Sequence, residues 1–445
     1  MSVNSELHGL LKKLRGQGEN LFPYLYNKSL ENFNPQKDWV FYSGPYWEDE
    51  EIVIAMETLL TGKWIAAGDN VHKFEQAFSK KFNFQSSLMV NSGSSANLVM
   101  IAALKKRFGW NDGDEIIVSP VGFPTTIAPL IQNGLIPRFV DINLSDLNFD
   151  LNHVEKAINS KTRGIFLSPV LANTPDLNRI QEMCKKNPQI KIILDGCDSL
   201  GSKWMGKDLS EYAVATSCSF YPAHHITTCE GGMVSSNDEE IIKIARRFAW
   251  WGRDCYCTGA VNLSPVGACG KRFSTWMEGN DNKVDHKYLF TEMGYNLKPL
   301  DMQGSIGLVQ LKKIDEIHTK RKLAKNTLEA LFKTHLGDAI SIPQELPGAD
   351  TSWFGLPIIC QQNKLKQDLV EFLEKNRIQT RNYFAGNILQ HPGYRHLDNY
   401  KNFPIANRVL DEVFFIGCHP SYNDKVYAYA NQVLEKFSKI WKNTH

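Results

Sequence analysis

The chain has 445 residues, more than one typical domain holds, so we expect two domains or one large domain with a smaller addition. Hydrophobic residues make up 42% and charged residues 22%, as in an ordinary soluble globular protein. The net charge of +2 predicts neither a nucleic-acid-binding protein nor one that binds a membrane surface. The polar N-terminus has no long apolar run, and we expect a cytoplasmic protein.

In chain order, residues 1–50 are polar and aromatic and are expected to form an N-terminal arm. Residues 51–82 have a helical pattern. Short apolar strands then alternate with helices, beginning with a strand at 87–91 and a helix at 92–107. This alternation predicts an α/β fold with a mostly parallel sheet covered on both faces, in a large domain over residues 51–320.

The pattern changes in the second half of the chain. Residues 255–287 are irregular and rich in Gly, Asn and Ser. A long helical pattern starts at Asp301, followed by short strands and another helix. We therefore expect a smaller C-terminal α/β domain over residues 321–445.

A turn of small residues, Asn91 to Asn97, joins an expected strand to an expected helix. Backbone N–H groups and hydroxyls at such a helix start can close around an anion, which makes the turn a candidate phosphate site. The same residues also fit a serine-rich turn in which a serine only caps the helix. Asp195 ends a buried strand and is expected to face the ligand crevice of the sheet, although a turn or cap aspartate fits equally well.

The most informative stretch is SFYPAHHITTCEGG, from Ser219 to Gly232. It resembles the vitamin B6-dependent aminotransferases and dehydratases that act on nucleotide-linked keto-sugars, the DegT/DnrJ/EryC1 family. In that family a Ser-Phe-aromatic motif leads, three residues later, to the lysine that bonds the cofactor, and His224 stands at that position here. The resemblance implies a fold type I PLP-dependent aminotransferase-like fold. Cys229 stands where the family has glycine, and a positive φ there would strain a cysteine.

The histidine changes the chemistry that the resemblance implies. Histidine cannot form the covalent bond that lysine forms with the cofactor, but its pKa of about 6.5 suits proton transfer near neutral pH. We therefore expect non-covalent pyridoxamine 5'-phosphate (PMP), the amine form of PLP, with His224 as the catalytic residue of a dehydratase.

The resemblance extends to residues that would bind the cofactor and the substrate. It implies that Asn296 approaches the phosphate from a partner subunit, so a homodimer is expected. The other cofactor residues implied are Gly93, Ser94 and Ser219 for the phosphate, Phe123 for ring stacking, Asp195 for the ring nitrogen and Asp198 for the ring hydroxyl. The segment TRNYFAGN resembles part of the family's sugar-nucleotide pocket and nominates Arg381, Phe384 and Asn387.

Nine cysteines do not predict a disulfide framework in a chain of this size. One group of dehydratases in the family, acting on CDP-4-keto-6-deoxy-D-glucose, carries a [2Fe–2S] cluster on four cysteines. Cys197, Cys255 and Cys257 match its first three ligands, with 57 residues and then one residue between them. The fourth would be Cys269, which lies beyond the family's usual position near Pro265. Loop thiols and a zinc site are the alternatives.

The resemblance thus implies an enzyme that removes the 3-hydroxyl of CDP-4-keto-6-deoxy-D-glucose. A separate flavin and iron–sulfur reductase would supply electrons through the cluster, toward a 3,6-dideoxyhexose of lipopolysaccharide O-antigen. Three alternatives stay open. They are a cluster-free dehydratase for GDP-4-keto-6-deoxymannose, an ordinary aminotransferase, and a non-catalytic relative.

Overall fold

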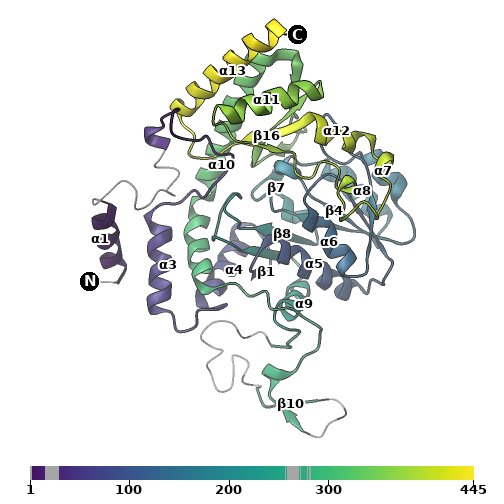
Figure 1. Cartoon of the computed structure of the whole chain (residues 1–445). Helices are drawn as coiled ribbons and strands as arrows, with labels where there is room; N and C mark the ends of the chain where they lie inside the picture. The colour runs from purple at the N-terminus through teal and green to yellow at the C-terminus, as the bar shows by residue number, and fades with distance from the viewer. Residues whose placement is uncertain are drawn as a thin grey trace.

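The fold was analysed in a computed structural model (Figure 1). It describes residues 3–15, 30–255, 257, 270, 272–277, 279 and 282–444. Cys269 lies outside the described residues, so its predicted role as the fourth cluster ligand stays a prediction. No helix in the described part of the chain combines the length and the apolar character needed to span a membrane.

The centre of the fold is a seven-stranded sheet in the order β1-β9-β8-β5-β4-β2-β3. The neighbouring pairs from β8 to β3 run parallel, and only β9 is antiparallel to its two neighbours, which confirms the predicted mostly parallel sheet. The strands are β1 (Ser86–Val90), β2 (Glu115–Val118), β3 (Ile136–Phe139), β4 (Thr162–Leu167), β5 (Lys191–Asp195), β8 (Ala215–Ser219) and β9 (Gly232–Ser236).

Both faces are buried at the middle of this sheet, which explains why a strand such as β5, KIILD, has a continuous apolar run rather than an alternating pattern. In β5, for example, Ile193 belongs to one apolar cluster, while Ile192 and Leu194 belong to another. The first cluster includes helices α5 (Gly93–Phe108), α6 (Pro124–Gln132) and α9 (Glu239–Ala249). The second includes α7 (Leu151–Ala157) and α8 (Leu177–Lys186).

The helical pattern over residues 51–82 corresponds to two helices, α3 (Asp49–Thr61) and α4 (Asp69–Lys81), with a break between them that the pattern did not indicate. The break has a physical reason in Asp301, whose carboxylate accepts hydrogen bonds from the backbone N–H groups of Asn70 and Val71 and so caps α4. A Cβ at Gly68 would lie 2.6 Å from that carboxylate oxygen, so the turn needs glycine. Asp301 itself begins the long helix α10 (Asp301–Leu336).

The C-terminal part contains a four-stranded antiparallel sheet in the order β12-β14-β16-β15 (Figure 1). Its apolar cluster begins on α10 at Ala324, which supports our proposal that a second domain starts near residue 321. The elements are β12 (Ile340–Ser341), β14 (Gly355–Cys360), β15 (Thr380–Asn382), β16 (Val413–Gly417), α11 (Asn363–Lys375), α12 (Pro404–Glu412) and α13 (Asp424–Thr444).

Several smaller elements lie outside the two main sheets, besides short 3-10 helices. Within the region predicted to be irregular, β10 (Thr275–Trp276) and β11 (Lys283–Val284) form an antiparallel pair that projects from the main body (Figure 1). The others are α1 (Val3–Arg15) and the short sheet of β6 (Lys203–Trp204), β7 (Lys207–Asp208) and β13 (Ala349–Asp350).

Candidate active site

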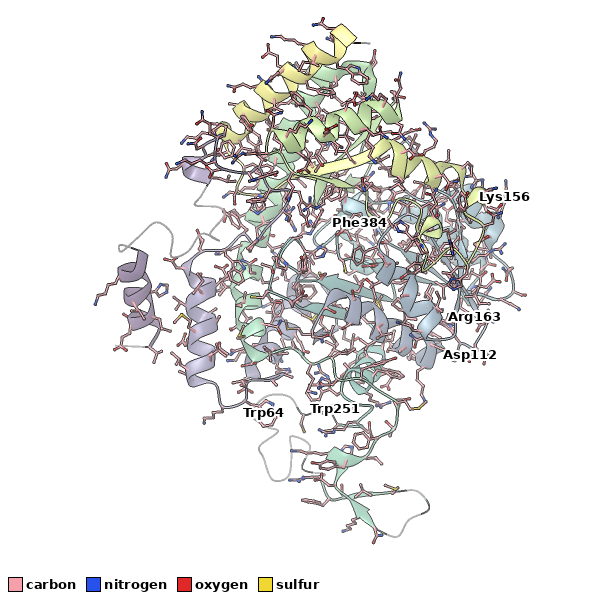
Figure 2. The ribbon with its side chains drawn as sticks, viewed as in Figure 1. Trp64, Asp112, Lys156, Arg163, Trp251 and Phe384 are labelled. Carbon is pink, nitrogen blue, oxygen red and sulfur yellow. The ribbon has the colours of Figure 1, made fainter. Side chains whose placement is uncertain are left out.

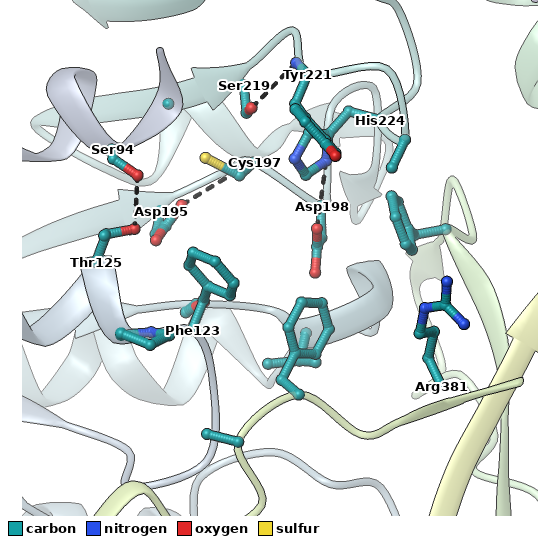
Figure 3. Close-up of a pocket in the computed structure, with 18 of the residues that line it drawn as sticks. Ser94, Phe123, Thr125, Asp195, Cys197, Asp198, Ser219, Tyr221, His224 and Arg381 are labelled. Atoms are coloured by element: carbon teal, nitrogen blue, oxygen red, sulfur yellow. Dashed lines mark hydrogen bonds and ion pairs between the residues drawn. The ribbon is translucent and has the colours of Figure 1, made fainter. Parts of the chain in front are cut away.

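A cavity of about 750 Å³ lies where β5 and β8 end, with the C-terminal segment around Arg381 on its other side (Figure 3). Its position at the carboxyl ends of parallel strands is the usual ligand site of an open α/β sheet. Most of the predicted site residues line it. They are Gly93, Ser94, Phe123, Asp195, Cys197, Asp198, Ser219, His224, Arg381 and Phe384.

The predicted phosphate contacts meet where α5 begins. The side chain of Ser92 accepts a hydrogen bond from the N–H of Ser95 and caps the helix, as the alternative interpretation of this turn expected. Gly93 approaches Ser219 so closely that an added Cβ would lie 2.5 Å from the serine Cβ. The hydroxyl of Ser94 donates a hydrogen bond to the hydroxyl of Thr125. Thr125 was not among the residues predicted for this site. Hydroxyls and the free end of a helix therefore surround one corner of the cavity.

Replacing Gly93 with alanine is expected to weaken PMP binding by about tenfold or more, because overpacking of this size costs about 1–3 kcal/mol. The added methyl would push Ser219 out of the phosphate corner. A titration of cofactor absorbance measures the dissociation constant. Gly393→Ala is the matched control, because its Cβ would meet no atom within 4 Å. Equal affinities in the two variants would contradict the assignment of this corner to the phosphate.

Asp195 is held rigidly at the base of the cavity. Its carboxylate accepts hydrogen bonds from Asn97 Nδ2 at 2.8 Å and from Thr126 Oγ1 at 2.7 Å, and the residue is only 6% exposed. The backbone N–H of Cys197 donates to its second oxygen. These bonds keep a carboxylate aimed at the cavity, as a partner for a cationic ring nitrogen requires. Thr126 was missed from the sequence, and Asn97 was placed in the candidate phosphate turn rather than beside Asp195.

His224 lies in the loop between β8 and β9 and points into the cavity (Figure 3). Its Nδ1 lies 3.5 Å from Asp198 Oδ1 but has no hydrogen-bond partner among the described residues. Burial lowers the pKa of His224 to about 3, and the nearby positive charge of Arg321 adds to the shift. The imidazole is therefore neutral near pH 7, with a nitrogen that can accept a proton, but it is a weaker base than the histidine of pKa about 6.5 expected from the sequence.

Asp198 is the acidic neighbour of this histidine. Burial raises the pKa of its carboxyl group to about 7; the backbone N–H of Leu171 opposes that rise, and the negative charge of Asp195 adds to it. Asp198 also accepts a hydrogen bond from the Leu171 N–H at 3.3 Å.

Two aromatic rings, those of Phe123 and Phe384, contact each other in the wall of the cavity. Phe123, 51% exposed, lies edge-on to Phe384 with ring centroids 6.1 Å apart. Figure 2 shows Phe384 beneath the C-terminal elements. The guanidinium of Arg381 stacks over the ring of Tyr42 at 4.3 Å. Other lining residues of this wall that the sequence analysis missed are Asn382, His391 and Tyr394.

Two nominated residues lie elsewhere. Asn387 does not line the cavity; it is fully buried, donates to Asn407 Oδ1 and accepts from the N–H of Leu389. Asn296 is exposed outside this chain's cavity, where it accepts a hydrogen bond from Lys298. Its approach to a partner's phosphate stays a prediction.

The described cysteines do not assemble a metal site. Cys197 lines the cavity, and burial together with the Asp195 carboxylate raises the pKa of its thiol. Cys255 and Cys257 are both buried and interact with each other. No group of three or more His, Cys, Asp or Glu side chains within the described ranges is arranged to hold a metal ion. The described geometry therefore does not support the predicted cluster, and we assign no step to it.

Cys229 has a left-handed backbone, with φ of 73°, so the strain anticipated at this glycine position is present. Replacing Cys229 with glycine is expected to raise the free energy of unfolding by about 0.5–1 kcal/mol, because the relief of strain exceeds the added chain entropy. Denaturant unfolding measures the change. Cys229→Ala is the control, since it removes the thiol but keeps the Cβ, and an equal gain in both variants would disprove the backbone explanation.

The sequence was next compared with known proteins. The model of the DegT/DnrJ/EryC1/StrS aminotransferase family matches residues 47–436. The chain belongs to this family. One member, dTDP-4-dehydro-2,6-dideoxy-D-glucose 3-dehydratase of Saccharopolyspora spinosa, is 36% identical over 89% of this chain and 86% of its own length. The lipopolysaccharide biosynthesis protein RfbH of Salmonella typhimurium is 34% identical, over 89% of this chain and 91% of its own.

A solved structure of the family has the same fold. The E. coli GDP-4-keto-6-deoxy-D-mannose-3-dehydratase with bound hydrated PLP superposes with a TM-score of 0.77 and 29% identity, covering 89% of this chain and 99% of that chain. The predicted fold type I PLP-dependent aminotransferase-like fold is thereby confirmed.

Proposed function

We propose that this chain is a PMP-dependent dehydratase that removes the 3-hydroxyl of a nucleoside-diphosphate-linked 4-keto-6-deoxyhexose. The observation that carries the proposal is His224, a neutral imidazole in the cavity at the place of the family's lysine. No lysine is among the described residues that line the cavity. An ordinary aminotransferase, which bonds its cofactor through lysine, is therefore disfavoured. The 3-dehydratase names of two similar proteins support the same reaction.

The cavity has the groups that PMP needs. Gly93, Ser94 and Ser219 would hold its phosphate at the start of α5, Asp195 its ring nitrogen, and Phe123 one face of the ring. When bound, PMP supplies an amine that condenses with a keto group and a ring that accepts electrons. The fixed carboxylate of Asp195 matches the positive charge of such a ring, because its oxygens are already oriented by Asn97 and Thr126.

His224 would take the proton whose removal begins the elimination. Its Nδ1 faces Asp198, which leaves Nε2 as the ring nitrogen that takes a proton inside the cavity. The proton taken by His224 can be returned to the departing 3-hydroxyl, so the C3–O bond breaks and water leaves. The elimination itself balances as loss of water. The two electrons that a 3-deoxygenated product requires would come, without a reductase, from PMP, which would end as PLP with release of ammonia.

The sugar nucleotide would enter between the two aromatic rings and Arg381. The Arg381 guanidinium carries the charge that a diphosphate requires, and its stacking on Tyr42 holds the planar group in place. We propose CDP-4-keto-6-deoxy-D-glucose as the first candidate substrate, on the match of the cysteine motif to the CDP-sugar dehydratases. Two of the similar proteins are named for dTDP- and GDP-linked sugars, so all three nucleotides belong in the test.

The proposed dehydratase could work without or with a [2Fe–2S] cluster, and the described geometry favours the version without it. That version corresponds to the GDP-sugar dehydratase given as an alternative in the sequence analysis. Its support is that no group of three or more possible ligands occurs among the described side chains. The cluster version, with its reductase, further requires Cys269 as a ligand. Iron and sulfide assays on purified protein separate the versions: about two irons per chain would establish the cluster version, and no iron the cluster-free one.

We also propose a homodimer. Trp64 and Trp251, 39% and 40% exposed, both lie in the lower part of the view in Figure 2, and Asn296 forms a backbone bridge with Trp250, the neighbour of Trp251 in the chain. Exposed aromatic side chains are typical of protein interfaces.

The direct test offers purified protein loaded with PMP to the CDP-, dTDP- and GDP-linked 4-keto-6-deoxyhexoses in separate single-turnover reactions. We expect one of them to give a 3-deoxygenated product that is detected by mass spectrometry. A product in which the keto oxygen is replaced by an amine would establish an aminotransferase instead. Unchanged sugars in all three reactions would indicate a non-catalytic relative.

A further inference from the structure

Arg321 is a buried cation on α10 that the reaction outlined above does not use. Only 1% of the residue is exposed. Burial lowers the pKa of its guanidinium to about 10, so the group still carries a positive charge at neutral pH. No carboxylate forms an ion pair with it in the part of the chain that the structure describes. Asp198 attracts this charge from beyond ion-pair distance, so an opposite charge only partly offsets the cost of burying the guanidinium, which calls for a compensating role.

The hydrogen bonds of Arg321 connect three separate segments at backbone carbonyls. Nη1 donates to Phe354 O at 3.1 Å, just before β14, and to Cys418 O at 3.5 Å, just after β16. Nη2 donates to His224 O at 3.3 Å. The planar guanidinium offers several N–H donors in fixed directions, so one side chain ties the histidine loop to the C-terminal sheet.

Arg321 also reaches the imidazole of His224 through an aromatic ring. Its guanidinium lies 5.7 Å from the centre of the Phe354 ring, and the same ring lies 5.4 Å from the centre of the His224 ring. Phe354 lines the cavity. Arg321 therefore holds the backbone of His224 directly, and it contacts the imidazole ring of His224 indirectly, through Phe354.

We propose that Arg321 is a positioning residue for His224, fixing its carbonyl and, through Phe354, the orientation of its ring. The inference rests on the proposed function to the extent that His224 moves a proton.

The charge of Arg321 has a second effect, because a positive charge disfavours a second one nearby. It contributes to the lowered pKa of His224, after burial. The other titratable groups around this imidazole are Asp198 at 3.5 Å, Tyr221 with its ring centre 6.4 Å away, and the adjacent His225. Loss of Arg321 should therefore raise the pKa of His224, whereas a merely structural role would leave it unchanged.

The test compares Arg321→Met and Arg321→Lys with Lys325→Met as the control. Lys325 is a buried cation one turn along the same helix, but it pairs with Glu329 and lies over Trp353. In the PMP-loaded enzyme, Arg321→Met is expected to lower kcat about 10- to 100-fold with little change in KM, because a displaced base loses its alignment. Arg321→Lys should recover only part of the rate, since an ammonium group cannot span the same carbonyls.

A second readout does not depend on turnover. Histidine labelled at its ring carbon, with the His224 signal assigned by its absence in His224→Asn, is titrated by NMR in each variant. We expect an upward shift of the His224 pKa in Arg321→Met and none in Lys325→Met. Should the Met variant fail to fold, a lowered kcat and a displaced His224 signal in Arg321→Lys support the proposal.

The outcomes separate the two proposals. If the wild-type protein dehydrates no sugar while the His224 signal responds to Arg321, the proposed function fails and the positioning role stands. If the wild-type protein is active but Arg321→Met keeps both its kcat and its His224 titration, the positioning role is overturned.

Discussion

His224→Asn is expected to lower the kcat of dehydration by about 10²- to 10⁴-fold, the usual contribution of a general base. Asparagine fits the space of the imidazole but has no basic nitrogen, so the proton that begins the elimination stays in place. Cofactor affinity should change little, because the phosphate corner around Gly93 and the carboxylate of Asp195 are untouched. Single-turnover rates and a cofactor titration measure the two quantities.

The matched control for this variant is His225→Asn. His225 is an adjacent buried histidine that donates to Ser352 O and does not line the cavity. It should lose stability but keep most of its kcat. A His224→Asn enzyme that turns over at the wild-type rate would remove the histidine from the reaction. His224→Lys should restore a covalent bond to the PLP form, seen as a shifted absorption band, and its absence would mean that position 224 does not correspond to the family's lysine.

Asp195→Asn is expected to lower kcat by about 10²- to 10³-fold, comparable to the loss of a preorganised charge-stabilising group. The amide carries no charge to match the cofactor ring. The amide oxygen can still accept from Asn97 and Thr126, which share one carboxylate oxygen, but the NH2 group cannot accept from the Cys197 N–H at the other position. Pre-steady-state rates at saturating PMP measure the effect on chemistry apart from binding.

Asp141→Asn is the control for Asp195→Asn. Asp141 is also buried, but its carboxylate accepts the N–H groups of Ile405 and Ala406 at the start of α12, outside the cavity. Both variants should unfold at lower denaturant concentration, yet only Asp195→Asn should lose turnover. Equal loss of kcat in the two variants would show that Asp195 acts through stability alone.

The fold could largely be predicted because its signals are local. Strands buried on both faces have apolar sequences, so β1 was predicted to within one residue and β5 was predicted to end at Asp195. The break between α3 and α4 was not predictable from that pattern. It depends on Asp301, more than 230 residues away from Asn70, whose N–H it accepts.

Residues of the candidate site could be predicted where they belong to a contiguous sequence motif, as His224 and Gly93 do. It was not predictable where the contact is tertiary. Asn97 and Thr126 reach Asp195 only because α5 and α6 pack beside β5. Arg321 lies in the charged run HTKRKLAKN, and such a run on a helix is normally solvated, yet this one side chain is buried against His224.

The most direct test of the account is the fate of the oxygen on the third sugar carbon. The PMP-loaded protein is incubated with nucleotide-linked 4-keto-6-deoxyhexoses that carry a heavy oxygen isotope at that position, and both the sugar and the water are examined by mass spectrometry. We predict that the heavy oxygen passes into water with wild-type protein and stays on the sugar with His224→Asn. Heavy oxygen that stays on the sugar in the wild-type reaction, while an amine appears at the keto carbon, would contradict the account.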